Sequence, residues 1–145
     1  MSQVIIYNNQ NGNGISICTP SDPNNIEYVL ENNCPEGAII VDDSILPTGA
    51  DTQFQTAWYI SGNSVLVNFQ IAQSYQLSVL NQLVYNESAH RAVKTLSGLT
   101  NVPTDSEWNA LVSNAKTNIS SSTTTDQLVA AIAPVQAAIK ANADI

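Results

Sequence analysis

The chain has 145 residues, of which 43% are hydrophobic and 11% charged, and four Lys or Arg against twelve Asp or Glu give a net charge of −8. This length allows one ordinary domain or two small subdomains with a shared core, and the apolar content excludes a disordered chain. Asn, Gln, Ser and Thr take the place of the missing charges. Such a surface suits a protein that packs into an assembly, although an AT-rich genome would also enrich Asn.

Positive charge is confined to the end of the chain. No Lys or Arg precedes residue 91, whereas the first 86 residues hold seven Asp or Glu. Phosphate backbones and anionic lipid require clustered Lys or Arg, so the sequence argues against nucleic-acid and membrane partners. The lack of Lys and Arg in the first 86 residues also predicts that this part of the chain has no stabilising salt bridges. The start resembles no signal peptide and no stretch has the roughly 20 apolar residues of a membrane span, so we expect synthesis in the cytoplasm.

Short strands and turns are predicted over residues 1–67. Residues 4–7 are β-branched and aromatic, residues 8–14 are rich in Asn and Gly, and residues 15–18 alternate apolar with polar. This pattern predicts a hairpin with a loose tip. The other predicted elements are a short helix, a buried strand and a second hairpin, at residues 26–32, 38–41 and 58–67.

Helical periodicity begins at Asn68, which is a plausible cap, and a first helix is expected to end at Gly98. Apolar residues recur every four positions along it, and we expect them to form a stripe: Ile71, Tyr75, Val79 and Leu83, with Leu80 and Val84 beside them. That stripe looks wider than one helix and a small sheet would cover, which favours a homo-oligomer.

Two further helices follow. Thr104 and Glu107 have the spacing of a capping box, and Thr124 and Gln127 repeat it. Pro134 is expected to kink or divide the last helix. The sequence therefore predicts an α+β fold, with a small hairpin-rich antiparallel β subdomain at residues 1–67 and a helical hairpin or bundle at residues 68–145.

No arrangement of residues specifies a reaction. His90 is the one histidine, and neither a nucleophile elbow nor a phosphate-binding loop occurs, so we expect no catalytic residue and no cofactor. Asp42 and Asp43 form the one adjacent acidic pair. Neighbouring residues of a strand point to opposite sides, so a shared metal is not expected. Their predicted roles are turn formation, with Asp43 or Ser44 capping nearby amides, or contact with a partner.

Three aromatic residues, Phe54, Trp58 and Tyr59, lie within six positions. Packing in the core, contact with a partner and stacking on a carbohydrate all remain open for the group. Because Trp58 and Ile60 alternate along a strand, Trp58 is expected in the core and Tyr59 on the other side of the sheet. Phe54 and Tyr59, with Asp42 and Asp43, are the candidate partner-contact residues.

Cys18 and Cys34 are the two cysteines of the chain, and they lack the CxxC spacing. Cytosolic proteins rarely carry disulfides, so two reduced thiols are expected, with a disulfide as the alternative.

The block from Cys34 to Trp58, CPEGAIIVDDSILPTGADTQFQTAW, resembles small proteins encoded among the tail genes of tailed bacteriophages. Those proteins begin with a Val-Ile-Ile-Tyr-type strand, an Asn/Gly turn and a Cys-x-Pro stretch, as residues 4–20 do here. A Val-Asp-Asp-Ser-x-Leu-Pro segment, a Phe-x-x-x-Trp pair and a hairpin leading into a helix follow. The resemblance covers about residues 3–72.

This resemblance implies a non-enzymatic virion protein, a small adaptor or decoration subunit bound to other tail, neck or fibre proteins. An assembly chaperone that holds a fibre protein and then leaves is the alternative, and a small enzyme is a third hypothesis. Since the resemblance lies in the β-rich part, residues 1–67 are the expected attachment module.

Overall fold

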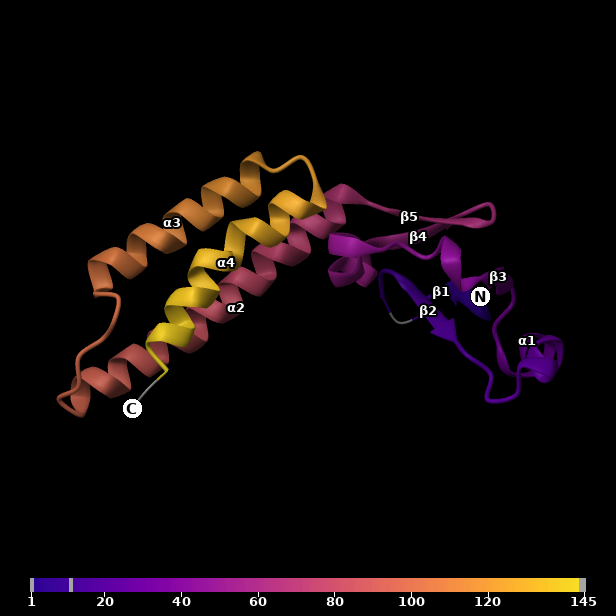
Figure 1. Cartoon of the computed structure of the whole chain (residues 1–145), viewed down its shortest axis with the longest axis horizontal. Coiled ribbons are helices and arrows are strands. Elements are labelled where there is room, and N and C mark those ends of the chain that lie inside the picture. Colours follow the sequence, from indigo (N-terminus) through magenta and orange to yellow (C-terminus); the bar gives the residue numbers. More distant parts are fainter. Residues whose placement is uncertain (1, 11, 144–145) are drawn as a thin grey trace. The chain divides into compact units, whose positions relative to one another are not determined.

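The computed structural model describes residues 2–10 and 12–143, and the chain divides into two compact units, Met1–Ala72 and Gln73–Ile145 (Figure 1). We call them the β unit and the helical unit. Antiparallel sheets with short helices form the first, and three long helices that pack together form the second, which confirms the α+β class. The boundary falls within the first turns of a helix, slightly after the one expected at Asn68.

The β unit is built on a three-stranded antiparallel sheet. Strand β1 (Gln3–Asn8) lies between β2 (Ile15–Cys18) and β3 (Ile39–Asp42). The Asn- and Gly-rich turn joins β1 to β2 as predicted, and the Asn9 amide donates to the Gly14 carbonyl across it at 2.9 Å. Strands β2 and β3 both pair with β1 in the antiparallel direction.

A second hairpin, β4 (Trp58–Ser61) and β5 (Ser64–Val67), covers one face of this sheet and confirms the prediction. Alternate residues of each strand point into the layer between them, as the period of a strand requires. The buried members of this core are Val4, Ile6, Ile15, Val41, Trp58 and Val65. The Trp58 indole also donates a hydrogen bond of 2.9 Å to the Asp51 carbonyl, so its polar atom is satisfied.

Helix α1 (Ile26–Asn33) connects β2 to β3 and contacts β1 and β3. Its Ile26 is buried, and so is Ile5, which points to the face of β1 opposite to Val4 and Ile6. Both faces of the small sheet therefore have apolar side chains to bury.

Three helices form the second part of the fold: α2 (Phe69–Leu96), α3 (Asp105–Ser121) and α4 (Thr125–Ala141). The Asn68 side chain accepts from the Ile71 amide at 3.2 Å, and Gly98 has a φ of +76° beyond the end of α2. These features confirm the predicted ends of α2. None of the helices that the structure describes is long and apolar enough to span a bilayer.

The predicted capping box at the start of α3 is present. Thr104 Oγ1 accepts from the Glu107 amide, and the Glu107 carboxylate accepts from the Thr104 amide at 3.0 Å. These hydrogen bonds, first from the backbone and then from the side chain of Thr104, lower the pKa of Glu107. A kink or a division was predicted at Pro134, and the division does not occur, because α4 runs through this residue as one helix.

The buried side of α2 differs from the predicted apolar stripe. Tyr75 is exposed, and Ile71, Val79 and Leu83 are half-buried. The most buried side chains of α2 within the helical unit are largely polar instead: Gln76, Leu80, Glu87, Arg91 and Lys94. Gln76 donates to the Leu128 carbonyl of α4 at 2.8 Å, which shows how a buried polar residue joins two helices.

Replacing Trp58 tests the core of the β unit. Trp58 is 6% exposed, so Trp58→Ala should lower the free energy of unfolding by about 3–5 kcal/mol. Thermal and denaturant melts measure the change, and Tyr59→Ala on the same strand is the matched control. A melting temperature for Trp58→Ala within a degree or two of wild type would contradict this role.

Candidate functional site

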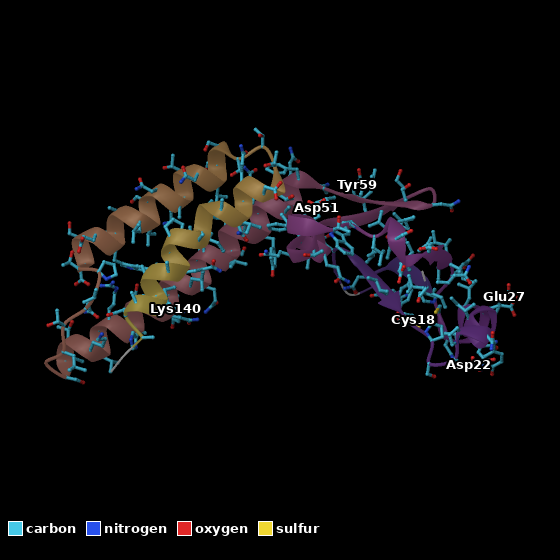
Figure 2. The ribbon with its side chains drawn as sticks, in the orientation of Figure 1. Cys18, Asp22, Glu27, Asp51, Tyr59 and Lys140 are labelled. Atoms are coloured by element: carbon cyan, nitrogen blue, oxygen red, sulfur yellow. The ribbon has the colours of Figure 1, made fainter. Side chains whose placement is uncertain are left out.

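Tyr59 and Leu66 form an exposed apolar pair on the outer face of the β4–β5 hairpin. They lie directly opposite each other in the register, and their exposed fractions are 43% and 44%. The inward positions on both sides belong to Trp58, Ile60, Val65 and Val67, so the outward direction of the pair follows from the strand period. The structure thus places Tyr59 on the surface, as expected (Figure 2).

This pair lies in a long stretch without charge. No Asp, Glu, Lys, Arg or His occurs between residues 52 and 86, a segment that includes the whole hairpin and the first half of α2. The segment also contributes several exposed large apolar side chains: Tyr59, Leu66, Tyr75, Leu77 and Tyr85. Protein-binding surfaces are depleted of charge at their centres and enriched in Tyr.

A hollow of about 230 Å³ lies beside Tyr59 in the β unit, between the β1–β2 turn and the start of β4. The turn is held close to the end of the 3-10 segment Gly49–Ala57, which precedes β4. Gly14 has a φ of +92°, and a Cβ there would lie 2.6 Å from the Gln55 carbonyl oxygen, so only glycine fits. Gln55 Nε2 in turn donates to the Ile15 carbonyl at 3.1 Å. Gly14 and Thr56, which both line the hollow, therefore lie in close contact.

Phe54 is fully buried, so its predicted role as a partner contact is wrong. It belongs to the 3-10 segment Gly49–Ala57, which precedes β4. The alternation that separates Trp58 from Tyr59 does not extend into this segment, because 3-10 geometry lacks the period of a strand.

Asp42 and Asp43 serve the turn after β3. Asp42 Oδ1 accepts from the Ser44 amide at 2.9 Å, so Asp42 caps the short helix Asp43–Ile45. Asp43 Oδ1 accepts from the Ser2 amide at 3.4 Å. The hydrogen bonds from Ser44 lower the pKa of Asp42. The prediction that Asp43 or Ser44 caps this turn is wrong, because the cap is Asp42, and the Asp43 carboxylate accepts from an amide 41 residues away in the sequence.

Residues 2–10 and 12–143 contain no cluster of three or more His, Cys, Asp or Glu side chains suited to a metal ion. His90 is half-buried on α2, and its Nε2 lies 2.9 Å from the Asn142 carbonyl oxygen. The histidine therefore belongs to the packing of the helical unit.

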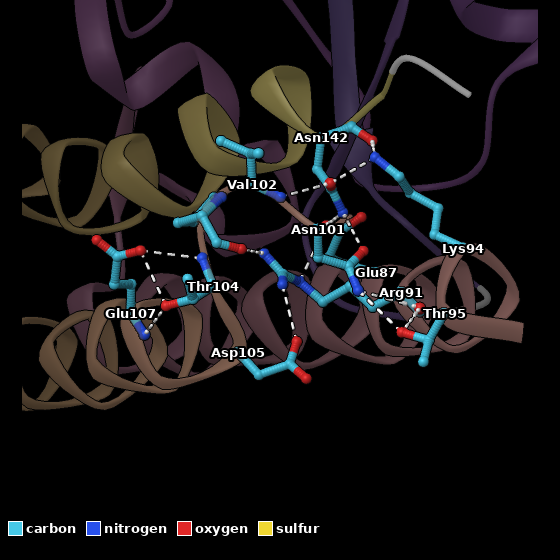
Figure 3. Close-up of polar contacts among 11 residues, drawn as sticks. Glu87, Arg91, Lys94, Thr95, Asn101, Val102, Thr104, Asp105, Glu107 and Asn142 are labelled. Atoms are coloured by element: carbon cyan, nitrogen blue, oxygen red, sulfur yellow. Dashed lines mark hydrogen bonds and ion pairs between the residues drawn. The ribbon is translucent and has the colours of Figure 1, made fainter. Parts of the chain in front are cut away.

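A buried polar network in the helical unit, which the sequence did not predict, joins α2, the α2–α3 loop and the end of α4 (Figure 3). Arg91 donates to Asp105 Oδ1 at 3.0 Å and to the Pro103 carbonyl at 2.8 Å, and its guanidinium lies 5.1 Å from the Trp108 ring centroid. Arg91 Nε is 3.3 Å from Glu87 Oε2 without a hydrogen bond, so that contact is Coulombic. This residue anchors the start of α3 to α2.

Asn142 is the other centre of the network, and none of it is exposed. Its Nδ2 donates to Glu87 Oε2 at 2.9 Å and to Asn101 Oδ1 at 3.1 Å. Its Oδ1 accepts from Lys94 Nζ at 2.8 Å and from the Val102 amide at 3.0 Å. One side chain thus fixes a buried cation, a buried carboxylate and the loop.

The network pairs the buried charges and supplies their hydrogen bonds, so that their burial does not destabilise the fold. Glu87 and Asp105 offset Arg91 and Lys94, and Asn142 supplies the hydrogen bonds that buried ions require. The signal in the sequence was the spacing of four between Glu87 and Arg91, which favours a helical ion pair. The role of Asn142 had no signal, since it lies about fifty residues away from its charged partners.

A second hollow, of about 590 Å³, lies on the exposed side of Arg91 and Trp108, between α2 and α3. An anion would be attracted to a guanidinium there. However, Arg91 already donates to the Asp105 carboxylate at the rim of this hollow. The arrangement offers no free positive charge for a ligand.

The comparisons give no relative from which a function could be carried over. The chain matches no protein-family model, no curated protein and no solved structure.

Asn142→Ala tests the network. The substitution leaves Lys94 and Glu87 buried without their hydrogen bonds to the amide, so the free energy of unfolding should fall by about 3 kcal/mol. Asn114→Ala, at an exposed position of α3, is the matched control and should change stability by less than about 0.5 kcal/mol. Urea unfolding curves measure both, and equal stabilities for the two variants would contradict the proposed role of Asn142.

Proposed function

We propose that this chain is a non-enzymatic structural protein of a bacteriophage particle, a small adaptor or decoration subunit associated with the tail or tail fibre. One observation carries the proposal: the β unit presents Tyr59 and Leu66 side by side on an uncharged hairpin. The sequence resemblance to phage tail-gene products, which covers the β unit, supplies the context.

The distribution of charge supports a protein partner rather than a nucleic acid or a lipid surface. The β unit contains no Lys or Arg, and Arg91 and Lys94 are buried. The exposed cations in the described part of the chain are Lys116 and Lys140. Two separate exposed cations do not provide the clustered positive charge that phosphate backbones require.

Self-association within the particle is part of the proposal. Helix α2 presents Tyr75, Leu77 and Tyr85 to the surface in the segment that lacks charge. Repulsion between negative charges usually keeps acidic proteins apart. Neighbouring copies would meet no such repulsion along these residues, because the segment has no charge. A homo-oligomer around the axis of a tail or fibre fits these features.

An assembly chaperone for a fibre protein is the second candidate. The same apolar pair would serve it, since a chaperone also binds through an exposed apolar surface. The two functions differ in the fate of the chain, because a structural subunit stays in the finished particle and a chaperone leaves it.

Mass spectrometry of gradient-purified particles of the phage that encodes this chain tests the proposal. A structural subunit should be present at a defined copy number relative to the tail proteins. If the chain is absent from particles but co-purifies with a fibre protein from infected cells, the structural role is wrong and the chaperone role is correct.

A paired substitution tests the surface itself. Tyr59→Ser with Leu66→Ser should reduce binding to the partner more than tenfold, since central interface side chains contribute about 2 kcal/mol or more. Tyr28→Ser is the matched control, because Tyr28 is exposed on α1 in the same unit. The melting temperatures of both variants verify folding. Equal recovery of the two variants in particles would contradict the assignment of this surface.

A further inference from the structure

Strand β5 has an open edge, because its sheet consists of β4 and β5 and β5 therefore pairs on one side only (Figure 1). The register shows which backbone groups face that edge. The Asn68 amide donates to the Ala57 carbonyl at 2.8 Å, so these two residues are a hydrogen-bonded pair of the hairpin. Hydrogen-bonded and non-hydrogen-bonded pairs alternate along an antiparallel ladder. The amides and carbonyls of Val65 and Val67 therefore point away from β4.

The other strand edges of the β unit are each protected. At β2, Gln55 Nε2 donates to the Ile15 carbonyl at 3.1 Å. At β4, the Trp58 amide donates to the Gln55 carbonyl. Strand β3 ends with Asp42, and a charge at an edge disfavours pairing with another strand. Strand β5 carries no charge and no Pro, and in the described part of the chain no hydrogen bond reaches its outer edge.

We propose that β5 pairs with β5 of a second copy of this chain, antiparallel and about a twofold axis, so that the two hairpins form one sheet. The outward backbone groups belong to Val65 and Val67, so these residues have to form the hydrogen-bonded pairs of the new ladder. The register that uses both of them places Val65 opposite Val67 of the second copy. Leu66 then lies opposite Leu66 of the second copy, on the axis.

The side chains fit this register. Leu66 is 44% exposed on the outer face, and its two copies would form a non-hydrogen-bonded pair with Cα atoms about 4.5 Å apart. Their side chains would pack against each other, with Tyr59 beside each of them. On the inner face, Val65 and Val67 of the two copies would adjoin and extend the apolar layer. Pairing thus buries apolar surface as well as backbone groups.

Charge favours a second copy at this place. The chain has a net charge of −8, so two copies repel each other in most orientations. Residues 52–86 carry no charge, and the edge of β5 lies within this segment. Two copies can therefore approach here without bringing like charges together. The inference rests on the self-association in the proposed function and assigns it to one strand.

Sedimentation equilibrium of the full chain, from about 1 µM to about 1 mM, tests the pairing. The wild-type chain should pass from monomer to dimer over this range. Leu66→Lys places like charges directly opposite each other on the axis, so the Kd of the dimer should rise more than tenfold. Tyr28→Lys adds the same charge at an exposed position of α1 and should leave the Kd unchanged. Thermal melts verify that both variants fold.

Complementary charges test whether Leu66 meets its own copy. Leu66→Lys and Leu66→Glu should each be monomeric, and their equimolar mixture should form a heterodimer because opposite charges then face each other. Leu77→Lys tests the exposed apolar residues of α2 instead. A dimer that Leu77→Lys disrupts and Leu66→Lys leaves intact would overturn the role of β5 and leave the self-association in the proposed function standing.

Amide hydrogen exchange followed by NMR reports on the backbone itself. The Val65 and Val67 amides should exchange about tenfold or more slowly in the dimer than in the dilute monomer. The Leu66 amide, which faces Tyr59 within the hairpin, should be protected in both states. A chain that stays monomeric to about 1 mM, or a dimer with unprotected Val65 and Val67 amides, would overturn the proposal. Neither result bears on the presence of the chain in purified particles.

Discussion

The positions of the few Lys and Arg side chains determine how each unit of this protein is stabilised and which charges remain on its surface. The whole chain has four Lys or Arg residues. Arg91 and Lys94 are buried with Glu87 and Asn142, and Arg91 also pairs with the exposed Asp105. An ion taken out of water is costly unless it is paired and hydrogen-bonded, so this cluster requires each of its members to be in place. It holds α2, the α2–α3 loop and the end of α4 together. Because two of the four cations are buried in the helical unit, the exposed charges of the described residues are acidic except for Lys116 and Lys140.

The β unit has to fold without ion pairs to side-chain cations. Its stability comes from apolar layers on a three-stranded sheet and from the side chains of Asp42, Asp43 and Asn68, which accept backbone hydrogen bonds. Its acids are concentrated near α1 and β3, while the β4–β5 hairpin carries none. The outer face of that hairpin is therefore a surface on which Tyr59 and Leu66 can meet a partner without desolvating a charge, and such desolvation is a main cost of forming interfaces.

Local signals in the sequence predicted the helices and strands well, but they could not predict contacts between residues that are far apart in the chain. The Asn- and Gly-rich turn predicted the first hairpin, and Thr104 with Glu107 predicted the start of α3, because each device acts within a few residues. The side of the sheet on which Tyr59 lies followed from strand alternation. The prediction for Phe54 was wrong because this residue lies in the 3-10 segment before β4, where the alternation of a strand does not apply. The polar side of α2 was missed because Glu87 and Lys94 depend on Asn142, whose position only the folded helices determine.

We propose that another protein of the particle binds to the outer face of the β4–β5 hairpin. A photoreactive benzoylphenylalanine in place of Leu66 tests this claim in the full-length chain, with the same residue in place of Tyr28 as the control; both sites are exposed in the β unit. After irradiation of infected cells, position 66 should give a covalent adduct with one phage protein, and position 28 should give much less of it. An adduct from position 28 and none from position 66 would contradict binding at the outer face of this hairpin.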